Sequence, residues 1–185
     1  FGFHLATLDV RQDALVHRKA IGQLLDDAQW QDRPAAERAK ILRAQPKPKA
    51  QADDISAPVL EVFQALREAH AAHGAHAVGP YIISMAQNAD DVLSVLWLAE
   101  QSDLLDANGR VPLDVAPLFE TVDDLRNAAD VMQGLYQDPA YRAHLAARGD
   151  HQMIMVGYSD SNKDGGLATA RWALYQSQTQ LAEVC

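Results

Sequence analysis

Cysteine is almost absent from this chain: Cys185 is the single one among 185 residues. One cysteine excludes an internal disulfide, and such scarcity is typical of reducing compartments, so we expect a cytoplasmic protein. Aromatic residues are also few, at 6%, whereas hydrophobic residues make up 48% and charged residues 22% of the chain. This composition is globular, and the length suffices for one domain with a sizeable core.

Long hydrophobic runs and an excess of positive charge are missing too. The best membrane candidate, "VLSVLWLAE", falls short of the ~20 residues that a spanning helix requires, and it follows two aspartates. The beginning of the sequence lacks the pattern of a secretory signal. The net charge of -9 argues against a nucleic-acid partner. We therefore expect neither a membrane nor nucleic acid as a partner, and an anionic substrate would need local cations or a metal.

Four apolar runs in the sequence predict β-strands, and each leads into a helical pattern. The predicted strands cover residues 3–10, 81–86, 115–120 and 152–159, and the predicted helices cover residues 12–27, 90–101, 121–137 and 167–184. Such alternation predicts an α/β fold with parallel strands. Asn88 is the expected N-cap of the second helix, and Thr121 with Asp124 forms a capping box for the third.

A long insertion separates the first strand–helix unit from the second. It contains a linker at residues 46–54, rich in proline and lysine, and then a helix over residues 57–73. Pro58 fits the first turn of that helix. Gly74 is expected to end it, within "HAAHGAH", where no carboxylate or cysteine completes a metal site with the histidines. We interpret these histidines as a solvated helix end.

Polar residues follow or close every predicted strand. They are Asp9, Arg11 and Gln12; Gln87, Asn88 and Asp90; Glu120; and Asp160, Asn162, Lys163 and Asp164. Because parallel strands end at one edge of a sheet, these side chains are expected to gather there. Cations beside carboxylates predict a site for a metal together with a phosphate or carboxylate ligand. Strand-to-helix loops are polar in any case, so simple capping loops are the alternative.

The stretch "YSDSNKDGG" at residues 158–166 raises the question of which metal, if any, is bound. Asp160, Asn162 and Asp164 match the first half of an EF-hand calcium loop. The decisive bidentate glutamate of that loop is replaced by Arg171, and the preceding element reads as a strand, which argues against calcium. Magnesium or manganese needs few protein carboxylates. Glu120 and Asp160 would suffice if their strands are neighbours, and Lys163 could then meet an anionic substrate.

Three segments, "HLATLDVRQ", "PLFETVDDLRNAADVM" and "MVGYSDSNKDGG", together resemble phosphoenolpyruvate carboxylase. "YIISMAQNADDVLSVLWLAE" resembles the strand and helix that lie between them in that family. The resemblance covers residues 1–185 as a single segment and is weakest across the linker. It implies an eight-stranded TIM-type (β/α) barrel within a longer, mainly helical chain that is usually a homotetramer. This segment would be the central part of the barrel domain, with about four βα units and extra helices.

The resemblance also implies an activity and a role for four residues. The family joins bicarbonate to phosphoenolpyruvate with Mg²⁺ or Mn²⁺, giving oxaloacetate and phosphate and replenishing the tricarboxylic acid cycle. Arg11 matches the family's arginine that grips the substrate phosphate, and a guanidinium fork suits phosphate oxygens. Glu120 and Asp160 match the two metal ligands. Lys163 matches a lysine beside them, whose charge would stabilise developing anionic charge.

Two catalytic parts of that family are missing from the sequence. There is no His-Pro-Thr-Glu motif, which carries a catalytic histidine, and no glycine- and arginine-rich loop that closes on the phosphate. We therefore expect this chain alone to be inactive, and a half barrel with unpaired strand edges to be marginally stable. The alternative is a stand-alone, non-catalytic α/β module that binds a divalent metal.

Overall fold

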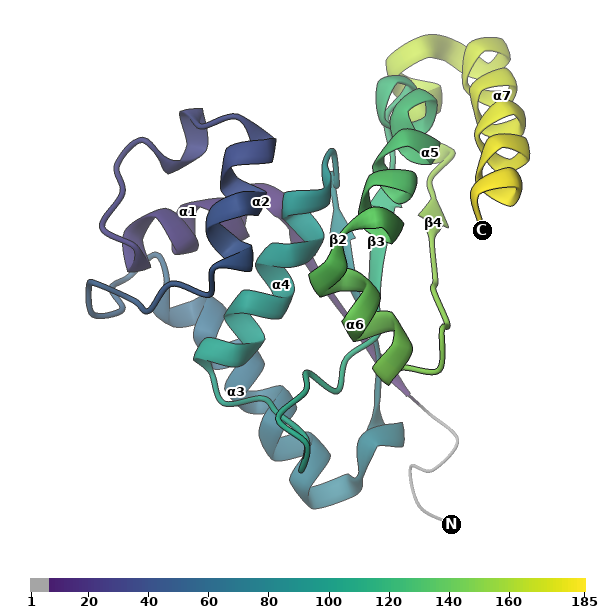
Figure 1. Cartoon of the computed structure of the whole chain (residues 1–185). Helices are drawn as coiled ribbons and strands as arrows, with labels where there is room; N and C mark the ends of the chain where they lie inside the picture. The colour runs from purple at the N-terminus through teal and green to yellow at the C-terminus, as the bar shows by residue number, and fades with distance from the viewer. Residues whose placement is uncertain (1–6) are drawn as a thin grey trace.

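The computed structural model describes residues 7–185 and contains one four-stranded sheet (Figure 1). The strands lie in sequence order, and neighbouring strands pair in parallel throughout. They are β1 (Leu8–Asp13), β2 (Val78–Ser84), β3 (Val115–Phe119) and β4 (Met155–Val156). The predicted α/β class with parallel strands is confirmed.

Helices connect the strands, and in Figure 1 α4, α5 and α6 lie along one face of the sheet while α7 stands beside α5. The α-helices are α1 (Ala14–Leu24), α2 (Ala35–Arg43), α3 (Ala57–His73), α4 (Ala89–Gln101), α5 (Val122–Gln137), α6 (Pro139–Ala147) and α7 (Ser159–Val184), with short 3₁₀ helices η1 (Trp30–Asp32) and η2 (Ala75–Ala77). Among residues 7–185, no helix combines the length and apolar character that crossing a membrane demands.

The two faces of the sheet carry different side chains because residues alternate along each strand. Tyr81, Ile83, Val115 and Phe119 join the main core, where helices pack. The alternate positions Ile82, Ala116 and Leu118 form a second, smaller buried cluster, against which Met155 packs. Apolar residues on both faces are typical of parallel sheets.

The first strand ends later than predicted. Residues 3–6 of the predicted run lie outside the described residues, and the strand extends to Asp13. Arg11 therefore lies within β1, opposite Ile82, rather than after the strand. The helix starts at Ala14 instead of residue 12 because the Asp13 side chain caps it, accepting a hydrogen bond from the Leu15 amide at 2.7 Å.

The fourth strand is much shorter than the predicted 152–159. Only Met155 and Val156 pair, and they pair with β3 alone. Before them, the Gln152 side chain donates a hydrogen bond to the Val115 carbonyl at 2.9 Å. This side-chain bond links the segment to β3 where no backbone strand pairing exists. The apolar pattern in this stretch signals burial, which is compatible with an irregular segment as well as a strand.

Helix ends follow the predicted capping residues closely. Thr121 Oγ1 accepts from the Asp124 amide at 3.0 Å, and the Asp124 carboxylate accepts from the Thr121 amide at 2.9 Å. Asn88 caps α4 in the same manner, with Asp91 as its partner. The helix predicted over residues 57–73 is confirmed, and Gly74 ends it with a φ of 83°.

Two helices were not predicted, α2 and α6. Both are short, at nine residues each, so their apolar periodicity is weak. Their starts nevertheless carry a signal: Pro34 is the N-cap of α2, and Asp138 caps α6 just before Pro139. Asp138 accepts hydrogen bonds from the amides of Ala140 and Tyr141, which is the usual work of an N-cap aspartate.

The stretch at residues 158–166 was predicted as a loop, and this is wrong. Helix α7 begins at Ser159 and is broken at Gly166, whose φ of 76° and ψ of 163° are not helical. A Cβ on Gly165 would lie 2.8 Å from Val122 Cγ2, so this glycine permits close contact with α5. Asp164 accepts a hydrogen bond from the Val122 amide at 3.1 Å. Contacts with the start of α5 thus stabilise a turn of helix that the two glycines alone would disfavour.

Alanine substitution at two glycines is predicted to change stability in opposite directions. Gly166→Ala should lower the free energy of unfolding by roughly 1–3 kcal/mol, because its backbone angles are reserved for glycine. Gly134→Ala, in α5 with open space around a new Cβ, should raise it by about 0.5–1 kcal/mol. Urea unfolding followed by circular dichroism measures both. Equal effects of the two substitutions would contradict the kink at Gly166.

Candidate functional site

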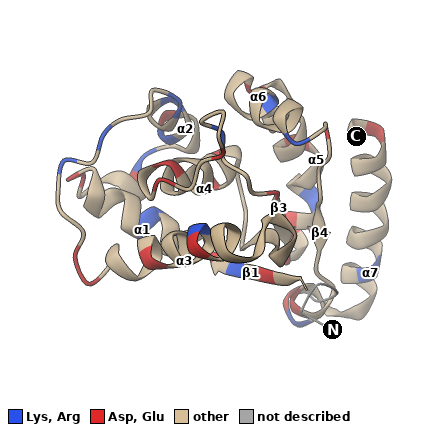
Figure 2. Ribbon diagram, turned by 90° about the horizontal axis from the view of Figure 1, so that it is seen from below, with Lys and Arg blue, Asp and Glu red and all other residues tan. Residues whose placement is uncertain are grey.

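An ion pair between Arg11 and Glu120 joins the first strand to the end of the third. Arg11 Nη2 donates to Glu120 Oε1 at 2.6 Å, although the residues are 109 positions apart in sequence. The Glu120 side chain is only 7% exposed, whereas that of Arg11 is 53% exposed. A buried carboxylate requires such a partner, since an unpaired buried charge is costly. Figure 2 shows acidic and basic residues side by side along β1.

The other carboxylate oxygen of Glu120 is held by the backbone. Glu120 Oε2 accepts a hydrogen bond at 3.2 Å from the amide of Met85, directly after β2. Gly157, directly after β4, has no side chain that would crowd Glu120. A Cβ at this position would lie only 3.3 Å from Glu120 Cγ. Elements on both sides of β3 therefore fix the orientation of Glu120.

Asp160 and Lys163 lie on the first turn of α7, just beyond β4. Lys163 Nζ donates to Asp160 Oδ1 at 2.8 Å, and both side chains are at least half exposed. The hydrogen bond and charge of Lys163 lower the pKa of Asp160, and the charge of Arg11 lowers it further. The same pair raises the pKa of Lys163. The guanidinium that contacts Glu120 thus also acts on Asp160, and all four predicted residues lie at one edge of the sheet.

The two carboxylates suit a hard divalent cation. Each already holds a cationic group, the Arg11 guanidinium or the Lys163 ammonium. Carboxylate oxygens are the ligands that Mg²⁺ and Mn²⁺ prefer, and Mg²⁺ commonly takes only one or two of them from the protein. Within residues 7–185, no group of three or more histidine, cysteine, aspartate or glutamate side chains is arranged to hold a metal ion. Water and substrate oxygens would therefore complete the coordination.

Other residues named from the sequence do not join this site. Asp90, expected within reach of it, instead accepts a hydrogen bond from Arg38 on α2 at 2.6 Å and is buried. Burial, and next the charge of Asp91, raise the pKa of Asp90. Asp160, Asn162 and Asp164 lie on a helix, not on a loop that could wrap calcium, which agrees with the sequence argument against an EF-hand.

Two contributors to the site were missed in the sequence: the Met85 amide and Gly157. A backbone amide carries no sequence signal. Gly157 could have been noticed, because a glycine at a strand often marks a place where another part of the chain approaches closely. Gln12 stays local, since its side chain accepts from the adjacent Asp13 amide at 2.9 Å.

Comparison with known proteins decides the family. A family model described as phosphoenolpyruvate carboxylase matches residues 1–185. The chain belongs to the phosphoenolpyruvate carboxylase family. Among its relatives, the phosphoenolpyruvate carboxylase of Xanthomonas oryzae pv. oryzae (strain MAFF 311018) is 52% identical over 99% of this chain. Those of Mycobacterium leprae (strain TN) and Rhodothermus marinus are 41% and 40% identical over the whole chain.

The chain spans about a fifth of the length of these phosphoenolpyruvate carboxylases: 21% of the first two and 22% of the third. The resemblance inferred from the sequence motifs is therefore confirmed as family membership over the whole chain. The four residues that gather at the sheet edge belong to segments that carried this resemblance.

The pKa of Asp160 offers a direct check of the arrangement. Lys163→Met should raise this pKa toward its ordinary value, because the largest cause of its lowering is removed. Arg11→Met should raise it less, since the arginine acts through space only. Titration of the Asp160 carboxyl carbon by NMR measures both, with Lys40→Met on α2 as the control. A larger rise in the Arg11 variant would contradict the described geometry.

Proposed function

We propose that this chain is the central part of the barrel domain of a phosphoenolpyruvate carboxylase. Parallel strands in sequence order, each followed by a helix, support half of a TIM-type (β/α) barrel. Both outer strands support it as well, because within residues 7–185 β1 and β4 each pair on one side only and leave an edge for further strands. The complete enzyme would be a cytoplasmic homotetramer.

The reaction we propose for the complete enzyme is carboxylation of phosphoenolpyruvate by bicarbonate. Bicarbonate attacks the phosphoryl group, giving carboxyphosphate and the enolate of pyruvate. Carboxyphosphate then breaks into carbon dioxide and inorganic phosphate, and the enolate captures the carbon dioxide to form oxaloacetate. The observation that carries this proposal is the Arg11–Glu120 contact beside Asp160 and Lys163. A guanidinium beside two acids and a lysine, at the carboxyl edge of parallel strands, supports a site for a phosphate together with a divalent metal.

Arg11 is suited to hold the substrate phosphate. Its guanidinium makes one hydrogen bond to the described residues 7–185, through Nη2 to Glu120. The half-exposed fork therefore keeps nitrogens that can donate to phosphate oxygens bidentately. Buried Glu120, held by the Met85 amide, fixes the position of the arginine's guanidinium.

Glu120 and Asp160 would hold the Mg²⁺ or Mn²⁺ ion. Such an ion, when bound, supplies Lewis-acid stabilisation of a substrate oxygen. Lys163, an exposed ammonium on the same helical turn as Asp160, would stabilise the anionic charge that develops on the substrate. A lysine is charged at physiological pH in any case, and the hydrogen bond and charge of Asp160 raise the pKa of Lys163 further.

Removing either proposed metal ligand should abolish the activity of the full-length enzyme that carries this segment. Glu120→Gln and Asp160→Asn keep the side-chain size but remove the negative charge, so Mg²⁺-dependent oxaloacetate production should fall by roughly 100-fold or more. Coupled reduction of oxaloacetate measures the rate, and calorimetry with Mn²⁺ measures binding. Asp123→Asn is the matched control, since Asp123 is an exposed acid at 82% that pairs only with Arg126.

The outcomes of these experiments distinguish a catalytic metal site from a non-catalytic metal-binding module. Full turnover in both ligand variants would remove the proposed metal site. A full-length wild-type protein that binds Mn²⁺ through Glu120 and Asp160 but forms no oxaloacetate would instead support a non-catalytic metal-binding module.

A further inference from the structure

The turn between β2 and α4 holds one oxygen of Glu120, and its shape is unusual. Met85, whose amide donates to Glu120 Oε2, has a φ of 55°, a left-handed conformation that non-glycine residues seldom adopt. Such a conformation costs free energy and persists only where surrounding contacts impose it. Hydrogen bonds to the residues that follow Met85 are therefore expected to hold this turn in its conformation.

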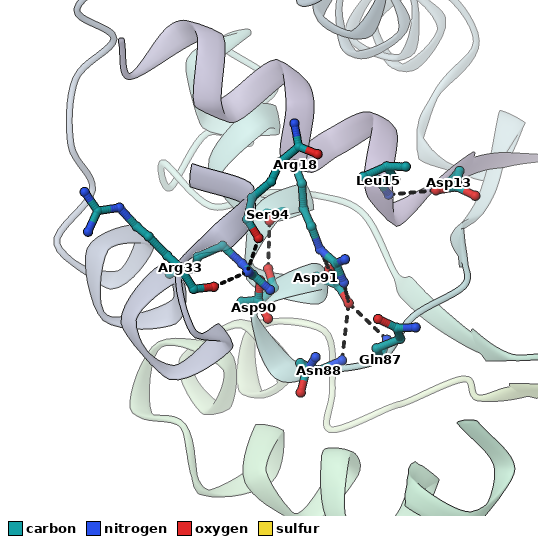
Figure 3. Close-up of polar contacts among 11 residues, drawn as sticks. Asp13, Leu15, Arg18, Arg33, Gln87, Asn88, Asp90, Asp91 and Ser94 are labelled. Carbon is teal, nitrogen blue, oxygen red and sulfur yellow. Dashed lines mark hydrogen bonds and ion pairs between the residues drawn. The ribbon is translucent and has the colours of Figure 1, made fainter. Parts of the chain in front are cut away.

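Asp91 supplies those contacts from the first turn of α4. Its Oδ2 accepts hydrogen bonds from the amides of Gln87 and Asn88, at 3.0 and 3.2 Å. These two residues close the turn that Met85 opens, and Ala86, directly after Met85, is fully buried. Figure 3 shows the Asp91 carboxylate beside the backbone of Gln87 and Asn88. One carboxylate oxygen thus fixes the backbone immediately after Met85.

Arg18 holds the Asp91 carboxylate in its turn. Arg18 Nε donates to Oδ1 and Nη2 to Oδ2, both at 2.8 Å, and Figure 3 shows its side chain reaching from α1 to Asp91. The Asp91 side chain is completely buried, and that of Arg18 is 15% exposed. A two-pronged pair of this kind sets orientation as well as charge. Because α1 directly follows β1, the pair links the element after Arg11 to the turn after β2.

We infer that Asp91, oriented by Arg18, is a positioning residue for metal binding: through the Met85–Asn88 turn it fixes the carboxylate of Glu120. This inference rests on the proposed function, in which Glu120 is a metal ligand. Groups that orient a metal ligand through hydrogen bonds influence metal affinity even though they never touch the ion. Asp91 does this from a buried position behind the site.

The neighbouring residue provides a matched comparison. Asp90 is also buried on the first turn of α4, and it is also paired with an arginine, Arg38. None of its hydrogen bonds within the described residues goes to the amides of the turn: its carboxylate binds Arg38, and its carbonyl accepts from Ser94 at 2.7 Å. Loss of Asp90 should therefore disturb packing and charge balance as much as loss of Asp91, without reaching Glu120.

The test compares Asp91→Asn with Asp90→Asn in the full-length enzyme. In the Asp91→Asn variant an NH2 group replaces one of the two acceptor oxygens, so the side chain cannot accept from Arg18 Nε while its oxygen also serves the turn. The Kd for Mn²⁺, measured by electron paramagnetic resonance of free Mn²⁺, should rise about 10-fold in Asp91→Asn and stay unchanged in Asp90→Asn. The KM for the metal should rise in parallel with the Kd, whereas kcat at saturating metal should be largely retained. Thermal unfolding of both variants shows whether their stabilities are comparable.

Each outcome bears on a different claim. Equal Mn²⁺ affinities in the two variants would overturn the positioning role. If Asp91→Asn does not fold, Arg18→Lys decides the matter, because it keeps the charge beside Asp91 but loses the two-pronged geometry. Arg18→Lys should weaken Mn²⁺ binding several-fold, and an unchanged Kd overturns the inference. Glu120→Gln serves as the reference. If the Kd for Mn²⁺ is the same in this variant as in the wild type, the proposed metal site itself is refuted.

Discussion

Parallel alignment of the four strands is the constraint on which the candidate site depends. Because β1 to β4 run in one direction and lie in register, Arg11, Met85, Glu120 and Asp160 lie at or near one edge of the sheet. The alternation of side chains then decides the face: Arg11 is level with Ile82, and Glu120 lies two residues beyond Leu118 on the same side. The ion pair between Arg11 and Glu120 is possible only under both conditions.

Charge at this edge is balanced by short-range pairs rather than by the protein as a whole. The net charge of -9 repels an anionic substrate over long distances. Arg11 and Lys163 offset this repulsion locally with their positive charges. Each is paired with one of the acids proposed to hold the metal. The edge of the sheet therefore carries two acid–base pairs, Arg11 with Glu120 and Lys163 with Asp160. Such a mixture of charges suits the proposed binding of both a cation and an anion. This arrangement is more informative than the presence of the four residues alone.

A second set of charges, Arg18 and Arg38 with Asp91 and Asp90, is largely buried where α1 and α2 contact the start of α4 (Figure 3). Buried ion pairs contribute little net stability compared with apolar packing, but they impose a particular geometry. Here the geometry concerns the turn after β2, where Met85 adopts a left-handed backbone conformation. The two neighbouring aspartates look alike in the sequence, yet only Asp91 bonds to the amides of the turn.

The sequence alone determined the order of the four strand–helix units, the parallel class, the N-caps of α4 and α5, the end of α3 at Gly74, and the polar residues Arg11, Glu120, Asp160 and Lys163 at the sheet edge. These features depend on apolar periodicity and on side chains that bond to nearby backbone, so they are local. The tertiary structure decided the placement of Arg11 within β1, the two-residue length of β4 and the helical state of residues 159–165. It also decided which of Asp90 and Asp91 bonds to the turn after β2. Those features depend on partners far away in the chain, such as Glu120 for Arg11 and Val122 for Asp164, and no local pattern encodes such contacts.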